Sequence, residues 1–345
     1  MKRLFILIFL IPSITLANII TTQNNSPEPV IPIRKLVIYS TKSFSDSWQK
    51  SDHPFKNKFE SQCNCIVEFT SLGGGNAILS RLILEGKNSP ADLVIGLDNN
   101  IADKAENLSL FVQHNIKVSN LVLPIQWTNK FFIPYDYGYL AFIYNDKRLK
   151  VPPKSFEELV NNPNIKIIMQ DPRSSTIGLG LIAWIHLVYQ DKASQFWSKI
   201  KRNIITVTKN WSDSYNLFMQ GEADMLLSYN SSPVFNMMVE GNYDIKVAPF
   251  KEGHYLQVEL MGKLKTSKEP ELADQFLNFV LSRSFQLSVP INNYMFPVIN
   301  VGEDLPKEYL KLFIPTKILM TSSSQMKVNR KLWVQEWLWA LSKKQ

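Results

Sequence analysis

The chain carries KLVIYST at positions 35–41, IVEFTSL at 66–72 and ADLVIGLD at 91–98. These three short runs are rich in β-branched residues, which favour strands. Between the second and third runs, apolar residues recur at helical spacing from Asn76 to Glu85, and Gly86 follows as a stop signal. The alternation of strand, helix and strand predicts an α/β domain with a largely parallel sheet.

A second series of alternating strands and helices follows, and two long β-like segments, 131–145 and 254–264, flank it. These segments are placed to carry the chain from one lobe to another and back. We therefore predict that residues 35–135 and 256–345 form lobe one and that residues 136–255 form lobe two. Two lobes that are joined in this way leave a cleft between them, where small ligands preferentially bind.

The N-terminus has the pattern of a secretory signal peptide. Lys2 and Arg3 precede an apolar run, and small residues stand at Thr15 and Ala17. The run is too short to span a bilayer, which takes about 20 apolar residues. We predict a cleaved signal peptide at 1–17, a flexible extension at 18–34 and an exported protein.

Composition argues against nucleic-acid binding. The formal net charge of the 345 residues is +8, but the basic residues are scattered rather than gathered into a stripe. A length of 345 residues fits two domains.

The two cysteines, Cys63 and Cys65, are separated by one residue. Two thiols cannot complete a structural zinc site, which takes four ligands. In an oxidising compartment the pair is expected to form a small disulfide. We interpret the pair as a local structural clip, with a redox role as the alternative.

The sequence offers no catalytic motif. G-x-S-x-G, H-E-x-x-H, the Walker A pattern and G-x-G-x-x-G are absent, and the four histidines are scattered. We therefore expect a binding cleft rather than an active site, with no catalytic residue, no metal and no cofactor.

Polar loops follow four of the predicted strands, at 71–76, 171–176, 209–213 and 229–233. Strand C-termini are where ligands bind in open α/β sheets. Glycines at 73–75 allow close backbone approach, and hydroxyl groups and free N–H groups at helix starts suit a phosphate or a polar ring edge. Tight turns and simple helix caps are the structural alternatives.

Several of these segments carry a family resemblance. From about Leu36 to Val301 the chain resembles the periplasmic thiamine-binding proteins of bacterial ABC importers. The resemblance rests on Glu85–Asp92, Gly96–Asn100, Pro134–Tyr139, Gln170–Arg173 and Gly253–Glu259.

The resemblance implies a two-lobed periplasmic-binding-protein fold that closes on thiamine or on its mono- or diphosphate. It also implies a periplasmic location and delivery to an inner-membrane permease coupled to a cytoplasmic ATPase. The family's ligand loops fall on Gly74, Gly75, Ser175, Thr176, Trp211, Tyr229, Asn230, Ser231 and Ser232, and its aromatic contacts on Trp48, Phe235 and Tyr294.

Three of these positions depart from relatives. Relatives can have an acid where this chain has Gly74, and a Tyr and a Trp where it has Phe235 and Tyr294. A ferric-ion or polyamine binder of the same architecture, or an exported enzyme that acts on thiamine phosphates, are the alternative functions.

Overall fold

The computed structural model describes residues 33–48 and 54–343, so the predicted signal peptide and most of the predicted extension lie outside the described residues. The strands are β1 (Arg34–Thr41), β2 (Cys65–Leu72), β3 (Leu93–Asp98), β4 (Ile133–Asn145), β5 (Ile167–Gln170), β6 (Ile204–Thr208), β7 (Met225–Tyr229), β8 (Ile245–Val247), β9 (His254–Lys263), β10 (Phe296–Pro297) and β11 (Ile318–Leu319). The first strand therefore begins within the segment that was predicted as a flexible extension. Arg34 pairs with Cys65 across β1 and β2, and its guanidinium forms an ion pair with Glu269 at 2.6 Å.

The helices separate these strands along the chain. They are α1 (Lys42–Trp48), α2 (Pro54–Cys63), α3 (Gly75–Glu85), α4 (Ala102–Asn107), α5 (Phe156–Asn161), α6 (Thr176–Tyr189), α7 (Ala193–Ile200), α8 (Trp211–Gln220), α9 (Pro233–Val239), α10 (Pro270–Val280), α11 (Arg283–Gln286), α12 (Val289–Asn292) and α13 (Ser323–Ser342). Within the described residues, no helix combines the length and the apolar character that crossing a membrane requires.

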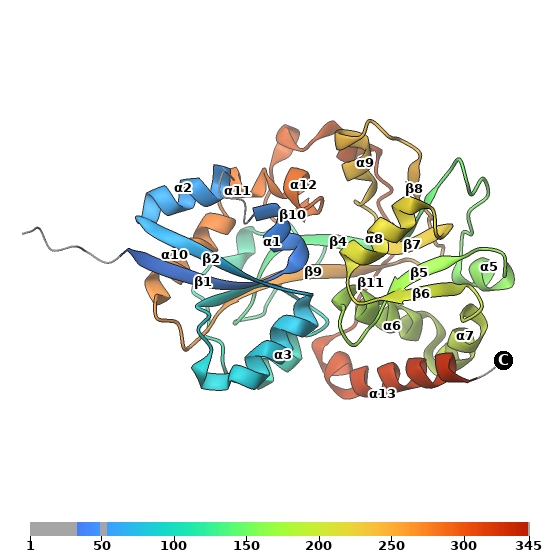
Figure 1. Cartoon of the computed structure of the whole chain (residues 1–345), viewed down its shortest axis with the longest axis horizontal. Coiled ribbons are helices and arrows are strands. Elements are labelled where there is room, and N and C mark those ends of the chain that lie inside the picture. Colours follow the sequence, from blue (N-terminus) through green and yellow to red (C-terminus); the bar gives the residue numbers. More distant parts are fainter. Residues whose placement is uncertain (1–32, 49–53, 344–345) are drawn as a thin grey trace, which may run out of the picture. The chain divides into compact units, whose positions relative to one another are not determined.

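The strands form one mixed sheet in the order β2-β1-β3-β9-β4-β7-β5-β6 (Figure 1). β1 pairs in parallel with β2 and β3, and β5 pairs in parallel with β6 and β7. Two antiparallel strands, β9 and β4, join these parallel halves. The predicted alternation of strands and helices is confirmed, and the sheet is parallel within each half.

β4 changes its pairing partner along its length. Its first part pairs with β9 over Ile133–Tyr139, and its second part pairs with β7 over Leu140–Tyr144. β4 and β9 thus coincide with the two crossing segments that the sequence predicts. The lobe boundaries at 135/136 and 255/256 stay a prediction.

The packing of β3 and α3 follows from their patterns. All six residues of β3 are buried, as expected for a strand that is covered on both faces. On α3, Ile78, Leu79 and Leu82 are buried in the core, and the helix ends before Gly86. The sheet positions the site, because loops at strand ends in both parallel halves lead to it.

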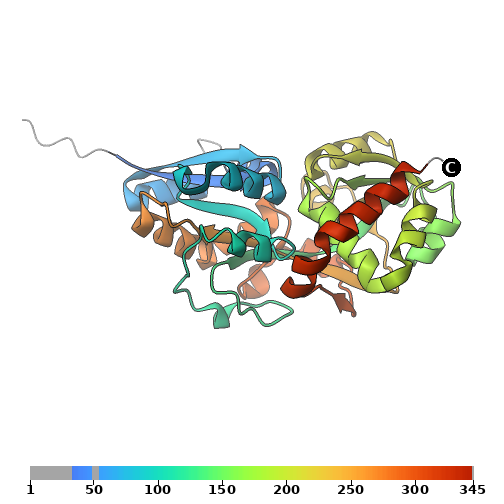
Figure 2. The same ribbon diagram turned by 90° about the horizontal axis from the view of Figure 1, so that it is seen from below.

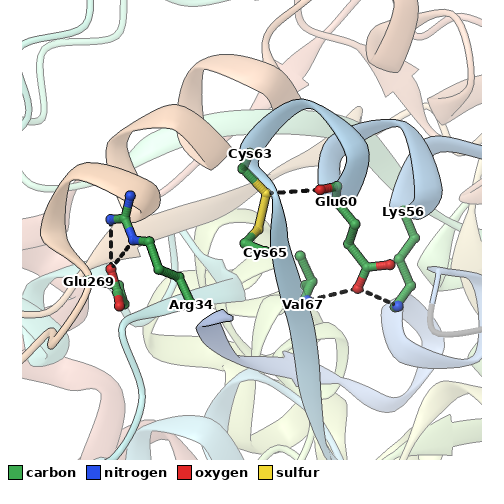
Figure 3. The surroundings of a disulfide bond; sticks show 7 residues. All are labelled: Arg34, Lys56, Glu60, Cys63, Cys65, Val67 and Glu269. Carbon is green, nitrogen blue, oxygen red and sulfur yellow. Dashed lines mark hydrogen bonds and ion pairs between the residues drawn. A yellow bond between two sulfur atoms is a disulfide. The ribbon is translucent and has the colours of Figure 1, made fainter. Parts of the chain in front are cut away.

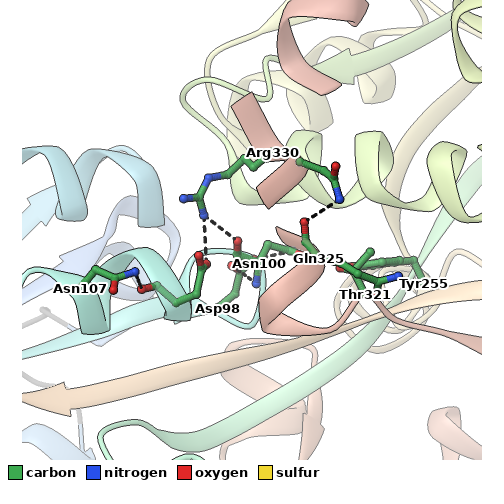
Figure 4. A network of polar contacts seen from close by, with 9 residues as sticks. Asp98, Asn100, Asn107, Tyr255, Thr321, Gln325 and Arg330 are labelled. Carbon is green, nitrogen blue, oxygen red and sulfur yellow. Dashed lines mark hydrogen bonds and ion pairs between the residues drawn. The ribbon is translucent and has the colours of Figure 1, made fainter. Parts of the chain in front are cut away.

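The C-terminal helix α13 packs against α6 and α7 and also contacts α4 (Figures 1 and 2). Figure 4 shows how polar contacts hold it: Arg330 donates from Nη1 to the Asn100 carbonyl oxygen at 3.2 Å and to Asp103 Oδ1 at 3.1 Å. The Tyr255 hydroxyl donates to Asn100 Oδ1 at 2.6 Å. This helix therefore contacts helices from the segments assigned to both predicted lobes.

Cys63 and Cys65 form a disulfide between the end of α2 and the start of β2, with their Cα atoms 5.2 Å apart (Figure 3). The predicted pairing is confirmed. Close by, Glu60 Oε1 accepts from the backbone N–H of Val67 at 2.8 Å and from Lys56 Nζ at 2.6 Å. The bond therefore belongs to a set of contacts that fastens α2 to β2.

Replacing both cysteines by serine is expected to lower the free energy of unfolding by about 1–2 kcal/mol, because the closed loop is only three residues long. Urea denaturation of the wild-type protein and the double variant measures the difference. A reductant should lower the urea midpoint of the wild-type protein to that of the double variant. It should leave the midpoint of the variant unchanged. A loss well above this range would mean that α2 depends on the bond for its folding.

Candidate functional site

A cavity of about 490 Å³ opens where loops from both parallel halves of the sheet meet. It takes residues from α1, from the start of α6, from α8, from the end of β7 and the loop that follows it, from α9, from β9, and from the end of α12 and the segment after it. Its lining residues are Ser43, Asp46, Ser47, Ile177, Trp211, Ser212, Tyr215, Asn216, Met219, Tyr229, Ser232, Phe235, Glu240, Glu259, Asn292, Asn293, Tyr294 and Met295.

A smaller cavity of about 40 Å³ adjoins it and shares several lining residues with it. Its walls are the starts of three helices, α3, α6 and α8. The lining residues are Thr41, Ser43, Gly73, Gly74, Gly75, Ser175, Thr176, Ile177, Lys209, Asn210, Trp211, Ser212 and Glu259.

The glycine loop before α3 lies directly against the loop before α6. A side chain at Gly75 would place its Cβ 2.9 Å from Thr176 Cγ2 and 2.8 Å from the Gly96 carbonyl oxygen. Asn76 Nδ2 also donates to the Pro172 carbonyl oxygen at 3.2 Å. Glycine at 75 is therefore what allows the two loops to approach so closely.

The three helix starts at the small cavity are capped in different ways. Ser175 Oγ accepts from the N–H of Gly178 at 3.4 Å, and Asn210 Oδ1 accepts from the N–H of Asp213 at 2.9 Å. At α3 the cap residue is Gly74, which has no side chain to fill this role. Free N–H groups and the positive ends of helix dipoles favour an anion, and Lys209 adds a positive charge.

Aromatic rings form the wall of the larger cavity. Trp211 stacks on Tyr215 with ring centroids 4.8 Å apart, and Trp211 Nε1 donates to Ser228 Oγ at 2.7 Å. Phe235 meets the ring of Tyr294 edge-on at 5.2 Å. Tyr294 has a φ of +53°, which is uncommon for a bulky residue and marks a constrained position. Such rings can stack on a flat aromatic ligand or attract a cation.

A row of three carboxyls crosses the sheet beside the cavities. Glu259 on β9 is in register with Asp98 on β3 and with Asp136 on β4. Burial raises the pKa of Asp98 to about 7, although Asn100 hydrogen-bonds it. Burial, and then the neighbouring Glu259, raise the pKa of Asp136 well above its usual value.

Glu259 is the member of this row that lines both cavities. It accepts a hydrogen bond from the Tyr135 hydroxyl, and burial still raises its pKa. Asn293 Nδ2 donates to Asp136 Oδ2 and so ties the row to the segment after α12. The hydroxyl of Tyr229 is buried at the cavity and has no hydrogen-bond partner among the described residues.

The structure brings most of the predicted site residues together. The residues that line one or both cavities are Gly74, Gly75, Ser175, Thr176, Trp211, Tyr229, Ser232, Phe235 and Tyr294. The assignment of roles to these side chains stays a prediction.

Three predicted residues do not line either cavity. Trp48 is 2% exposed and stacks on Phe285 with centroids 4.3 Å apart, in the aromatic core next to α1. The side chain of Asn230 accepts from the Tyr139 N–H and donates to the Phe313 carbonyl oxygen, so it links backbone segments. Ser231 is fully buried beside Met295.

Sequence reasoning missed several lining residues, of which Glu259 and Tyr215 matter most. Tyr215 lies one helical turn after Trp211, so the i, i+4 spacing was a usable signal. Glu259 ends a stretch that carries the family resemblance, but nothing local sets it apart. Ser43 and Asp46 on α1 come from a segment that shows no polar motif.

Comparisons with known proteins show which family the chain is similar to. The family model described as "Bacterial extracellular solute-binding protein" matches residues 88–316. The "Thiamine-binding periplasmic protein" of Escherichia coli K12 is 42% identical over 316 residues, which cover 91% of this chain and 96% of that protein. The protein of the same description from Brucella melitensis is 41% identical and is covered to 92%.

Among solved structures, one titled "Periplasmic thiamin binding protein" superposes with a TM-score of 0.86 at 42% sequence identity, covering 90% of this chain and 97% of that one. The predicted α/β periplasmic-binding-protein fold is thereby confirmed. The chain belongs to the bacterial extracellular solute-binding proteins and, within them, to the family of the thiamine-binding periplasmic proteins.

Proposed function

We propose that the two adjoining cavities bind thiamine, with or without phosphate, and that the protein delivers it to the inner-membrane permease of an ABC importer driven by a cytoplasmic ATPase. The observation that carries this proposal is the division of the site. An aromatic, acidic cavity that suits a flat cation adjoins a small cavity at three helix starts that suits an anion.

The larger cavity matches the two rings of thiamine, an aminopyrimidine and a cationic thiazolium. Its described lining residues include three carboxylates, Asp46, Glu240 and Glu259, and no lysine or arginine. Trp211, Tyr215 and Tyr294 supply aromatic faces, each of which attracts a cation by roughly 0.5–2 kcal/mol. The cavity therefore favours a positively charged aromatic ligand.

The smaller cavity matches the hydroxyethyl arm, which carries the phosphate in thiamine monophosphate and diphosphate. Ser175 and Thr176 supply hydroxyl groups at the start of α6, and Lys209 supplies a charge. Gly74 lines only this smaller cavity and offers no side chain there, so recognition of the aminopyrimidine falls to groups of the larger cavity. The names of the similar proteins support thiamine as the ligand.

Two measurements test the proposal. Mass spectrometry of the small molecule that copurifies with the native protein should identify thiamine or one of its phosphates. Titration calorimetry of the ligand-free protein with thiamine should show one site. No binding of thiamine or its phosphates would overturn the proposal, and hydrolysis of thiamine phosphates by the pure protein would favour the exported enzyme instead.

A linear polyamine is the second candidate, because carboxylates at Asp46, Glu240 and Glu259 line the cavity. Displacement of bound thiamine by spermidine at low concentration would support it. For a ferric ion, no cluster of three or more His, Cys, Asp or Glu that could hold a metal is found among the described residues. The similar proteins favour thiamine over both.

Replacing Ser175 by alanine is expected to reduce affinity for thiamine monophosphate more than affinity for thiamine. Ser175 Oγ accepts from Gly178 and still has its own proton to donate to a phosphate. A hydrogen bond to a charged group contributes roughly 1.5–3 kcal/mol and a neutral one roughly 0.5–1.5, so the difference should be about 1 kcal/mol. Calorimetry with both ligands measures it.

The variant also loses a helix cap, but this affects both ligands alike. Ser231→Ala is the matched control, because Ser231 is buried and lines neither cavity. Equal losses for the two ligands in Ser175→Ala would place the phosphate elsewhere.

A further inference from the structure

Asp98, Glu259 and Asp136 form a row of carboxyls on three neighbouring strands. Among the described residues that line the larger cavity, no lysine or arginine neutralises the negative charge of this row. Asp136 and Glu259 are register partners on β4 and β9, and Glu259 raises the pKa of the buried Asp136 carboxyl because the two would carry like charges. Asp98 and Asp136 are 1% and 0% exposed, and Glu259 opens to both cavities. Like charges so close in a buried site cannot all ionise readily.

A further buried group points to a ligand. The Tyr229 hydroxyl, on a residue that is 7% exposed, has no hydrogen-bond partner among the described residues and lies at the cavity wall. Buried polar atoms are normally paired, so an open hydroxyl at the cavity wall suits a polar group that is bound there.

We propose that this row is a proton-coupled counter-ion: it holds a proton while the cavity is empty and releases it when the cationic ring of thiamine enters. The O–H bond of one carboxylic acid breaks, its electron pair stays on the carboxylate, and the proton passes to water. The ligand's positive charge replaces the proton as the partner of the carboxylate. This inference rests on the proposed function.

The groups around the row give the direction of the effect. The titratable or charged groups that face it are Tyr135 on β4, Tyr229 on β7, Tyr255 on β9, Tyr309 in the 3-10 turn at 307–311, and Lys209 across the small cavity. The tyrosines are neutral near pH 7, because burial raises their pKa values. A bound cation therefore adds a charge that the empty site lacks, and it lowers the pKa of the row.

Linkage then sets the pH dependence. At pH values above the pKa of the row in the empty protein, no proton is left to release, and the affinity for thiamine is at its maximum and does not change with pH. Below that pKa the affinity for thiamine falls as pH falls, by up to about tenfold per pH unit for one proton. The decrease ends below the pKa of the row in the thiamine complex, which is the lower of the two pKa values.

Calorimetry of the full protein in buffers of different ionisation enthalpy measures protons released per ligand. The probes are thiamine and its uncharged isostere, in which a thiophene replaces the thiazolium. Thiamine should release up to about one proton between pH 6 and 7.5, and the isostere none. Because both share the aminopyrimidine, its titration cancels.

Equal proton counts for the two probes would overturn the inference while leaving the proposed function intact. Failure of both to bind would overturn the proposed function and this inference with it.

Variants sharpen the assignment. Glu259→Gln should abolish proton release and weaken thiamine binding about 10- to 100-fold. The affinity for the uncharged isostere should change little. Glu240→Gln is the matched control, since Glu240 lines the same cavity but is exposed and pairs with Asn236; it should keep the wild-type proton count. If Glu259→Gln retains full proton release, the inference fails.

Asp136→Asn provides a second readout should Glu259→Gln fold poorly. It removes the neighbour that keeps the row protonated, so proton release should fall while thiamine affinity at pH 6 is kept or tightened. A purely structural role for Asp136 predicts weaker binding with an unchanged proton count, which would contradict the inference.

Discussion

Replacing Gly178 by alanine is expected to lower the free energy of unfolding by about 3 kcal/mol, at the upper end of the range for overpacking. The added Cβ would lie 2.3 Å from the carbonyl oxygen of Gln170 and 2.9 Å from its carbonyl carbon. These are backbone atoms of β5, which is held between β6 and β7, so they cannot move aside cheaply. The start of α6 has to shift instead, and Ser175 shifts with it.

Gly180→Ala in the same helix is the matched control. Its Cβ would meet Leu140 Cδ1 at 2.7 Å, which is the end of a flexible side chain. Both changes gain the same helix propensity, roughly 0.5–1 kcal/mol, so their difference isolates the backbone clash. Urea denaturation measures both, and calorimetry with thiamine reports the site. Equal stability of the two variants would show that the backbone of β5 moves at Gln170 to accept the added Cβ.

Replacing Trp211 by alanine is expected to weaken thiamine binding by roughly 1–3 kcal/mol, the range for losing an aromatic stacking partner. Trp211 lines both cavities, stacks on Tyr215 and donates from Nε1 to Ser228. Thiamine should also quench the intrinsic fluorescence, and most of this quenching should vanish in the variant. Titration calorimetry and fluorescence titration measure the two effects.

Trp339→Ala is the control for both readouts. Trp339 is 56% exposed on α13 and lines neither cavity, so its removal should leave the affinity and the absolute drop in fluorescence per mole of protein unchanged. Trp211→Phe keeps a ring but loses the bond to Ser228, and it should fall between the wild type and Trp211→Ala. Full affinity in Trp211→Ala would make this residue a packing residue only.

The sequence predicts the local elements well. The strand predicted at 35–41 and the helix predicted at 76–85 are observed as β1 and α3, each one residue longer at its start. Both follow from short-range patterns, since apolar spacing and stop residues act within a single element. The polar loops at strand ends were visible for the same reason, and those around Gly75, Ser175 and Trp211 do line the cavities.

Tertiary structure alone settles which side chains reach the cavities. Trp48 packs on Phe285, 237 positions later in the chain, and so is drawn into the core rather than to the site. The row of Asp98, Asp136 and Glu259 exists only because β3, β4 and β9 meet in one register. Strand register depends on packing across the whole sheet, and no local pattern encodes a neighbour that lies more than a hundred residues away.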